Sequence, residues 1–256
     1  MIILNAIKII FLLGFLVFIH EGGHFLVAKL CKVKVNEFAI GFGKILWQKQ
    51  GKETKYSLRM IPLGGFCNME GEEESDAPGS FSKASVWKRI AIVLAGATVN
   101  IVFGILVYFI LVSTVGIQFV DPTRDTIANR IYYGAQNTGK FITSIFDSIK
   151  MLFTGGLQTD QMVGIVGISE VVVKTNGIIN YLNLLAVISV SLGVTNLLPI
   201  PALDGGKILI LIIEIIRRKP MKMETEAKIQ MLGFSILIAL SLFVTYNDIL
   251  RIGAGS

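Results

Sequence analysis

The chain has 256 residues, 53% of them hydrophobic, and a mean hydropathy of +0.68. This composition argues against a soluble domain and predicts an α-helical polytopic membrane protein. The formal net charge is +6, but the basic residues gather in loops rather than in an aromatic-rich patch, so we expect no nucleic-acid partner.

The first predicted span, residues 2–28, carries the motif His20-Glu21-Gly22-Gly23-His24 inside an apolar run. Ionisable side chains at that depth are costly and indicate a functional site. On a helix, His20, Glu21 and His24 share one face, so the two imidazoles can hold Zn²⁺ while the carboxylate reaches a water beside it. The chain has 2 His in total, both in this motif, which favours a metal site over a chance match.

The loop at 29–89 is predicted to contain a small sheet. Strand-like β-branched and aromatic content and a hairpin turn at 50–52 support it, with expected strands at 33–40, 44–48 and 54–61. We expect residues 62–65, Pro-Leu-Gly-Gly, to end the sheet. Its edge could pair with an unwound substrate. A hairpin without any substrate contact fits the sequence nearly as well.

The second span is expected at about 90–115, and Gly22 and Gly23 on the first helix predict the close approach of another helix. In the outer loop, 117–176, apolar residues recur at helical spacing with charged residues between them. They are Phe141, Ile142, Ile145, Phe146 and Ile149. This pattern predicts an amphipathic helix on the outer membrane surface, or equally one packed against the bundle.

The third span begins near Ile178 and is broken by Pro199 and Pro201, just before Asp204. Irregular backbone within a membrane is tolerated only around a protein-buried or watered cavity. A catalytic zinc usually has three protein ligands, so Asp204 is the best candidate for the third. Asn196 is a weaker candidate, either as a hydrogen-bond donor to the reacting carbonyl or as a partner for backbone freed by the prolines.

The fourth span is expected at about 231–245, and the basic residues orient the bundle. Residues 29–89 hold 11 Lys and Arg and 204–228 hold 6, which makes 17 on one side; residues 117–176 hold 5, and Lys8 and Arg251 bring the other side to 7. The positive-inside rule therefore predicts that 29–89 and 204–228 are cytoplasmic loops, with the metal near the cytoplasmic side.

The HEGGH motif, the NxxPxPxLDGG segment that begins at Asn196 and the IPLGGF hairpin together resemble the site-2 protease family of intramembrane zinc metalloproteases, in its bacterial branch. The resemblance implies a four-helix membrane protein with a small membrane-associated β-hairpin or sheet. It implies one zinc ion held by His20, His24 and Asp204, catalytic Glu21 and supporting Asn196.

The resemblance also implies a single protease domain over 1–256, with the β-element at 33–72. The outer loop at 117–176 is too short for the PDZ domain that this branch usually carries. Prolines that are usual in the family are replaced in Gly96-Ala97-Thr98-Val99-Asn100 and in Gly164-Ile165-Val166-Gly167. The sequence therefore does not decide whether the backbone is kinked at these two places.

The activity implied is zinc-dependent cleavage of transmembrane segments in a bacterial inner or plasma membrane. The expected partners are the lipid bilayer and a substrate. The substrate is either a single-span membrane protein, such as an anti-sigma factor, or a signal-peptide remnant. The sequence does not give the oligomeric state. One alternative is another membrane metallopeptidase that uses Glu170 or Glu214 as third ligand. The other is a catalytically inert helix binder or a zinc sensor.

Overall fold

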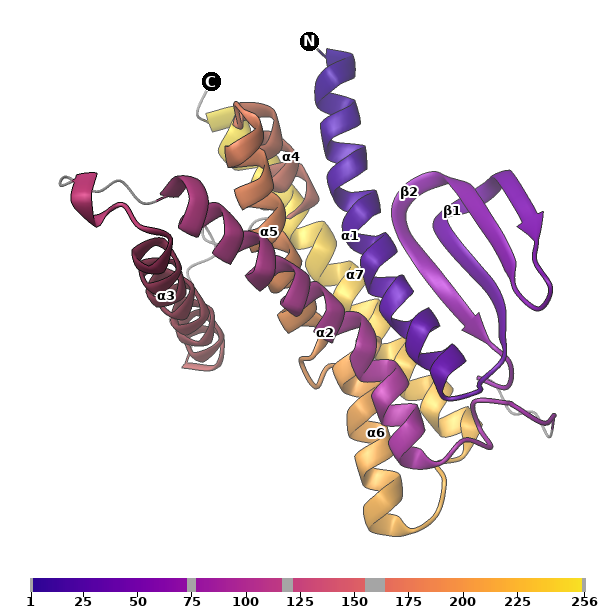
Figure 1. Ribbon diagram of the computed structural model, residues 1–256. Helices are drawn as coiled ribbons and strands as arrows, with labels where there is room; N and C mark the ends of the chain where they lie inside the picture. The colour runs from indigo at the N-terminus through magenta and orange to yellow at the C-terminus, as the bar shows by residue number, and fades with distance from the viewer. Residues whose placement is uncertain (1, 73–76, 117–121, 155–163, 255–256) are drawn as a thin grey trace. The chain divides into compact units, whose positions relative to one another are not determined.

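The computed structural model describes residues 2–72, 77–116, 122–154 and 164–254 (Figure 1). In this part of the chain four helices are long and apolar enough to cross a membrane. They cover Ile3–Leu30, Val86–Gly116, Ile178–Asn196 and Met223–Arg251. The four predicted spans are confirmed as helices, and the second and fourth are longer than their apolar cores because polar residues extend the same helix.

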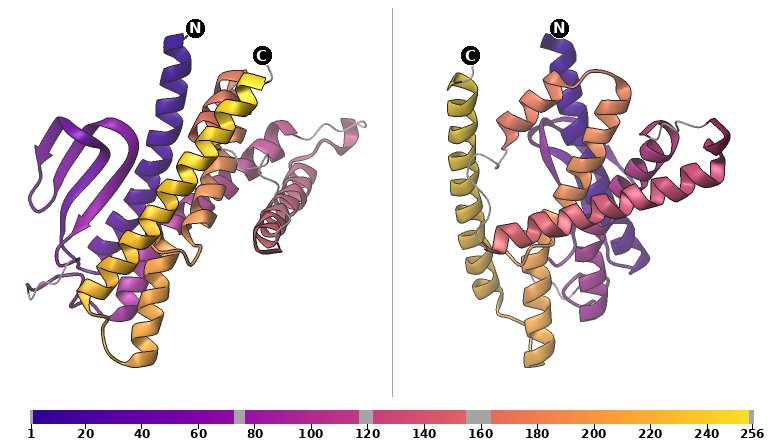
Figure 2. Two further views of the ribbon diagram at one scale, coloured as in Figure 1. Left: turned by 180° about the vertical axis from the view of Figure 1, so that it is seen from behind. Right: turned by 90° about the vertical axis from the view of Figure 1, so that its left-hand side faces the viewer.

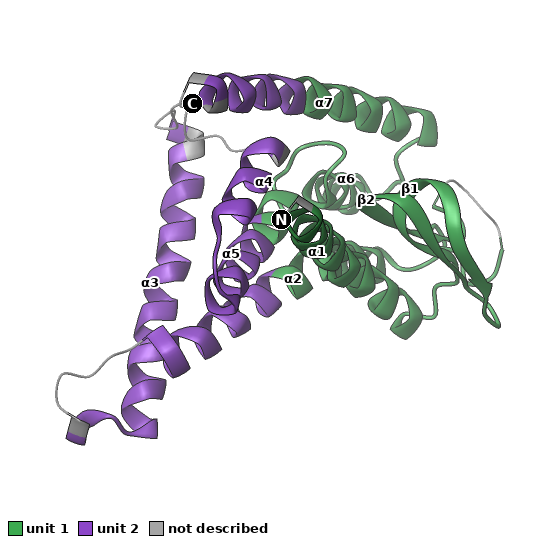
Figure 3. Cartoon of the chain, turned by 90° about the horizontal axis from the view of Figure 1, so that it is seen from above, with its two compact units in different colours: residues 1–100, 192–239 green, residues 101–191, 240–256 purple. Residues whose placement is uncertain are grey.

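The remaining elements lie between these helices in chain order. The full order is α1 Ile2–Leu30, β1 Val35–Gln50, β2 Lys55–Met69, α2 Val86–Leu111, a π-helical turn Val112–Gly116, a 3-10 turn Pro122–Arg124, α3 Ile127–Thr154, α4 Ile165–Lys174, α5 Ile178–Asn196, α6 Asp204–Arg217 and α7 Met223–Ala254. Two compact units divide the chain, 1–100 with 192–239 and 101–191 with 240–256, coloured separately in Figure 3.

The sheet of the first unit consists of two long, bent, antiparallel strands beside α1, as the left-hand view in Figure 2 shows. The first half of β1 has partners on both sides, since Ala39 pairs with Phe66 and with Ser57. The prediction that residues 62–65 end the sheet is wrong, because β2 continues to Met69. The Pro-Leu-Gly-Gly segment lies where the strand bends, and after the bend its backbone pairs again with β1.

The first unit is held together by a core at the C-terminal end of α1 and the N-terminal end of α2. The core joins both helices to the sheet and to α6: Ala28, Val33, Val35, Phe38, Cys67, Met69, Phe81, Ile92, Val93 and Leu211. Gly23 faces α2 so closely that a Cβ there would lie 2.7 Å from the Ala95 carbonyl oxygen, whereas Gly22 faces open space. Only Gly23 thus allows the predicted close approach of helices.

The segment 204–228 is not simply a loop, because α6 occupies its first half. Asp204 stands in the first turn of this helix, and Arg218 ends it in a left-handed conformation with φ 53°. The apolar residues after Gly206 recur at helical spacing, and α6 buries Ile210 and Leu211. A helix of 14 residues is too short to span a bilayer, so its apolar face serves packing within the first unit.

The second unit contains the predicted amphipathic helix, which as α3 runs from Ile127 to Thr154 and is longer than expected. Tyr108 of α2 stacks on Phe141 of α3, with ring centroids 4.2 Å apart. α2 itself is an uninterrupted α-helix from Val86 to Leu111, so the replacement of a proline by Ala97 leaves no break there. Whether α3 lies on the outer membrane surface stays a prediction.

Candidate metal centre

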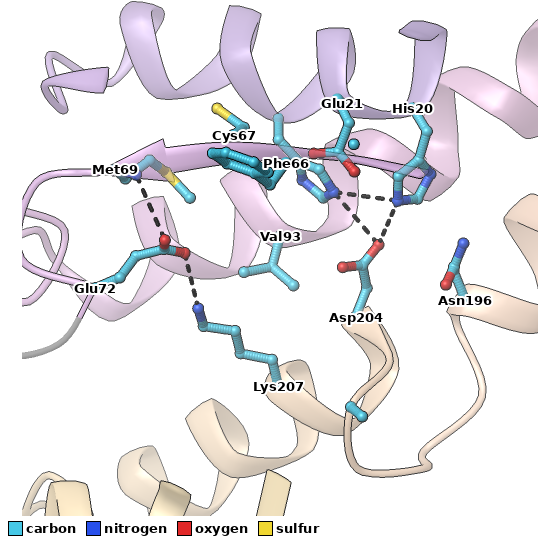
Figure 4. Close-up of a pocket in the computed structure, with 13 residues that line it drawn as sticks. His20, Glu21, Phe66, Cys67, Met69, Glu72, Val93, Asn196, Asp204 and Lys207 are labelled. Carbon is cyan, nitrogen blue, oxygen red and sulfur yellow. Dashed lines mark hydrogen bonds and ion pairs between the residues drawn. The ribbon is translucent and has the colours of Figure 1, made fainter. Parts of the chain in front are cut away.

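The first helix presents the two histidines and the glutamate of its motif to one pocket, as the helical spacing predicts (Figure 4). The imidazoles of His20 and His24 stand one turn apart, and their Nε2 atoms are 3.3 Å from each other. Both residues are buried, at 9% and 8% exposure. Two imidazole nitrogens that face each other at this distance, inside apolar surroundings, form half of a metal site.

His24 is fixed by contacts with α2. Its Nδ1 lies 2.8 Å from the carbonyl oxygen of Ile92, which orients the ring and leaves Nε2 for a ligand. The ring packs against Gly96, where a Cβ would come within 2.7 Å of the His24 Cε1 atom. Any larger residue at position 96 would displace the imidazole, so this glycine is part of the site's construction.

Asp204 reaches the same point from another part of the chain. Helix α5 ends at Asn196, and a loop with Pro199 and Pro201 leads to Asp204 in the first turn of α6. The Oδ2 atom of Asp204 lies 3.2 Å from His20 Nε2 and 3.5 Å from His24 Nε2. The structure therefore brings together the three ligands that the two sequence motifs suggest.

The three ligand atoms fit a zinc ion. Their separations are 3.2, 3.3 and 3.5 Å, a nearly equilateral triangle. A tetrahedral zinc with bonds of about 2.0–2.1 Å places its ligand atoms about 3.3–3.4 Å apart. The donor set of two imidazoles and one carboxylate is also a common one for catalytic zinc. In the described residues this is the group of His, Cys, Asp and Glu side chains that could hold a metal.

The pocket around these ligands has a volume of about 330 Å³ and is lined by four parts of the first unit: α1, the end of β2, α2 and the segment from the end of α5 into α6. Glu21 of α1 and Asn196 of α5 line it together with the metal-ligand candidates, and Gly65 to Cys67 and Met69 of β2 form one wall. Glu21 packs beside Gly65, where a Cβ would lie 3.1 Å from its Cγ. Glu21, expected as the base, and Asn196, the weaker candidate expected as a donor, thus share the pocket with the metal-ligand candidates.

Sequence reasoning missed an ion pair at one end of the pocket. Lys207 Nζ lies 3.2 Å from Glu72 Oε1, and the backbone N–H of Met69 donates to Glu72 Oε2 at 3.4 Å (Figure 4). The pair joins the end of β2 to α6, one turn after Asp204. The spacing of three residues between Asp204 and Lys207 was a usable signal, because it places both on one helical face.

The alternative third ligands lie elsewhere. Glu214 forms an ion pair with Arg89 at 2.8 Å and accepts the N–H of Met221 at 2.9 Å. Glu170 belongs to the second unit and pairs with Lys174. Both carboxylates are engaged with other partners, and neither belongs to the group of side chains whose ligand atoms converge.

The two cysteines are free thiols, and Cys67 is the one that lines the pocket. Burial, with the negative charges of Glu21 and Glu72 adding to it, raises the pKa of the Cys67 thiol to about 12. Cys67 lies outside the group of three side chains whose ligand atoms converge.

Four apolar helices with a His-Glu-His face and a converging aspartate define a multi-pass membrane metalloprotease of the zinc type. Comparison with known proteins agrees: the model of Peptidase family M50 matches residues 8–240. The chain belongs to this family and is a zinc metalloendopeptidase of the site-2 protease type.

The chain is similar over nearly its whole length to named bacterial proteins. A Clostridium acetobutylicum protein whose name places it among zinc metalloproteases is 29% identical, covering 96% of this chain and 97% of its own. Zinc metalloprotease RasP of Bacillus licheniformis is 26% identical, with coverages of 97% and 99%. Regulator of sigma-W protease RasP of Bacillus subtilis is 24% identical, also with 97% and 99%.

Proposed function

We propose that this protease cuts peptide bonds within transmembrane segments, with His20, His24 and Asp204 as its zinc ligands. The observation that carries the proposal is the convergence of three ligand atoms in a pocket whose walls include two membrane-spanning helices. A metal ion in this pocket is placed to act on a polypeptide segment that lies within the membrane. Single-span membrane proteins, including signalling precursors such as anti-sigma factors, and signal-peptide remnants are the substrates that suit it.

Glu21 is the residue we assign to proton transfer. It lines the pocket one residue from His20 and on the same helical face as both imidazoles. When bound, zinc supplies the Lewis acidity that polarises the scissile carbonyl and acidifies water. Glu21 accepts a proton from the attacking water on its carboxylate and delivers that proton to the leaving amine nitrogen.

The β2 wall is the element we assign to substrate presentation. A transmembrane helix hides its carbonyls in its own hydrogen bonds, so the segment must unwind before cleavage. Residues 65–69 pair with β1 through one edge and line the pocket, which suits the other edge to strand addition. Gly65 allows β2 to lie close to β1 and α1 at this wall, because a Cβ there would lie within 3.1 Å of atoms of Ala39, Val17 and Glu21.

Two further assignments concern the role of Asn196 and the side of the membrane on which the site lies. Asn196 lines the pocket at the end of α5, where its amide N–H can donate to the carbonyl of a bound segment. The distribution of Lys and Arg supports a cytoplasmic position for the site, because 17 of the 24 basic residues belong to the side on which α1 ends.

The test is zinc content of the purified protein in lipid vesicles, measured together with cleavage of a model single-span substrate. We expect one zinc per chain and cleavage in the parent. Glu21→Gln should retain zinc and lose activity by at least about a thousandfold, since general acid–base catalysis contributes up to about 10⁴. Glu224→Gln, on an exposed carboxylate at the start of α7, is the matched control and should behave as the parent.

An active Glu21→Gln variant would remove Glu21 from the mechanism. Zinc without cleavage in the parent would instead favour a helix binder, which would also be indifferent to this substitution.

A further inference from the structure

The loop that carries Asp204 into the site, residues 197–203, satisfies its backbone N–H groups almost entirely by itself. Pro199 and Pro201 have no N–H. The other donors bond to nearby carbonyls, Leu197 to Val194 at 3.1 Å, Leu198 to Thr195 at 3.1 Å, Ile200 to Leu198 at 2.7 Å and Leu203 to Ile200 at 3.1 Å. The exception within this fully described loop is Ala202, whose N–H donates to the side-chain oxygen of Gln230 on α7 at 2.5 Å.

Ala202 is also the strained residue of this loop. Its φ of +74° is a left-handed conformation that is unfavourable for any residue with a Cβ. Such a conformation persists only where the surroundings hold it. The N–H of this very residue, two positions before Asp204, donates the hydrogen bond to Gln230.

The loop is in close contact with helices on two sides. A Cβ on Gly206 of α6 would lie 2.7 Å from the carbonyl carbon of Ile200, and one on Gly233 of α7 would lie 2.5 Å from that of Pro201. These contacts fix where the loop lies, and the one at Gly233 is made by the carbonyl of the Pro201–Ala202 peptide, whose oxygen would lie 2.3 Å from that Cβ. They leave the N–H side of the same peptide to be selected by another group. Gln230, half-buried one turn before Gly233, supplies that selection.

We propose that Gln230 is a positioning residue for the metal centre. Its side-chain oxygen holds the peptide before Ala202 in the left-handed conformation that directs Asp204 Oδ2 toward His20 and His24. Loss of this oxygen removes the hydrogen bond that holds a strained φ, so it favours rotation of the Pro201–Ala202 peptide toward another acceptor. Rotation there shifts Asp204 away from the ligand triangle.

The proposal rests on the zinc ligands proposed above, and the experiment measures zinc affinity by competition with a chelator, alongside the melting temperature of the zinc-free protein. Gln230→Met preserves length and removes the acceptor, and we expect zinc to bind about tenfold more weakly, as for other groups that orient a ligand. Gln230→Glu keeps an acceptor oxygen and should stay within about threefold of the parent. Gln136→Met, which removes a hydrogen bond to Tyr132 on α3, is the matched control.

The decisive variant is the double substitution Gln230→Met with Ala202→Gly. Glycine adopts φ +74° without a steric penalty, so it should restore zinc affinity to within about threefold of the parent. A general packing role for Gln230 predicts no such rescue. If the single variant cannot be purified in folded form, the double variant should be recovered; failure to recover it would contradict the proposal.

Three results separate the possible failures. Zinc affinity unchanged by Gln230→Met, or a double variant as weak as the single one, would overturn the positioning role. Asp204→Ala is measured beside them. If Asp204→Ala also keeps the parent's affinity, the ligand assignment itself is wrong; if it loses zinc while Gln230→Met does not, only the role of Gln230 fails.

Discussion

Two aspartates beside apolar helices, Asp248 buried and Asp204 partly buried, serve opposite purposes in this protein. Asp248, near the end of α7 in the second unit, is 1% exposed, and its carboxylate accepts the N–H groups of Gly164 at 3.0 Å and Gly167 at 2.8 Å. Arg251 adds a contact at 3.3 Å. Asp204, in the first unit, directs Oδ2 to two imidazole nitrogens, His20 Nε2 at 3.2 Å and His24 Nε2 at 3.5 Å.

The difference shows that depth in a membrane does not by itself mark a functional carboxylate. Asp248 caps the first turn of α4, where free N–H groups and the helix dipole favour a negative charge. Its hydrogen-bonding capacity is largely used, so it stabilises structure. Asp204 meets side chains that are metal ligands in other proteins, and with neutral imidazoles its three-atom cluster suits a bound cation.

Asp204→Ala should give the largest effect. Removing one of three proposed ligands is expected to weaken zinc binding by at least about a hundredfold and to abolish cleavage. The measurement is chelator competition on the purified protein. Asp248→Ala is the comparison, and equal loss of zinc in the two variants would erase the distinction between the aspartates.

Glu214 provides the next test, because its carboxylate is buried with Arg89 as partner. Glu214→Leu leaves the Arg89 charge without compensation and should lower the free energy of unfolding by about 3–5 kcal/mol. Arg89→Met together with Glu214→Leu should recover much of this loss, since neither charge then remains. Denaturant titration in detergent measures both, and loss of zinc in Glu214→Leu at intact folding would return Glu214 to the list of ligands.

Asp248→Ala should have a smaller effect on folding and none on the metal. Loss of a helix cap costs about 0.5–2 kcal/mol, so we expect a destabilisation of this size with zinc affinity equal to the parent. Hydrogen exchange should show faster exchange of the Gly164 and Gly167 amides, which lose their acceptor. Unchanged exchange at both amides would contradict the capping role.

The smallest effect concerns Glu37 on the sheet. Burial opposes its ionisation, but hydrogen bonds from Ser57 at 2.6 Å and Arg59 at 2.8 Å outweigh burial and hold the pKa of Glu37 below its usual range. A lowered folded-state pKa stabilises the fold above the unfolded-state pKa, and this contribution disappears as pH falls through the folded-state value. Parent and Glu37→Gln should therefore differ in unfolding free energy at pH 7 by roughly 1 kcal/mol or less and converge in acid.

Much of the fold and site could be read from local patterns. Apolar runs longer than about 20 residues predict spans wherever they occur, because the bilayer imposes that length. The two histidines and Glu21 share a face because the helical repeat alone places them there. Asp204 could be selected because two prolines beside it make ordinary helical burial impossible.

Other features depend on contacts between distant segments. The sequence predicted that β2 would end at Pro62, but its pairing with β1 after the bend carries it to Met69. The opposite uses of Asp204 and Asp248 were equally hidden, since both are acidic residues in apolar surroundings. Local sequence determined which side chains could hold zinc; only the tertiary structure decided which carboxylate meets the imidazoles and which receives N–H groups, because those partners are 81 to 184 residues away along the chain.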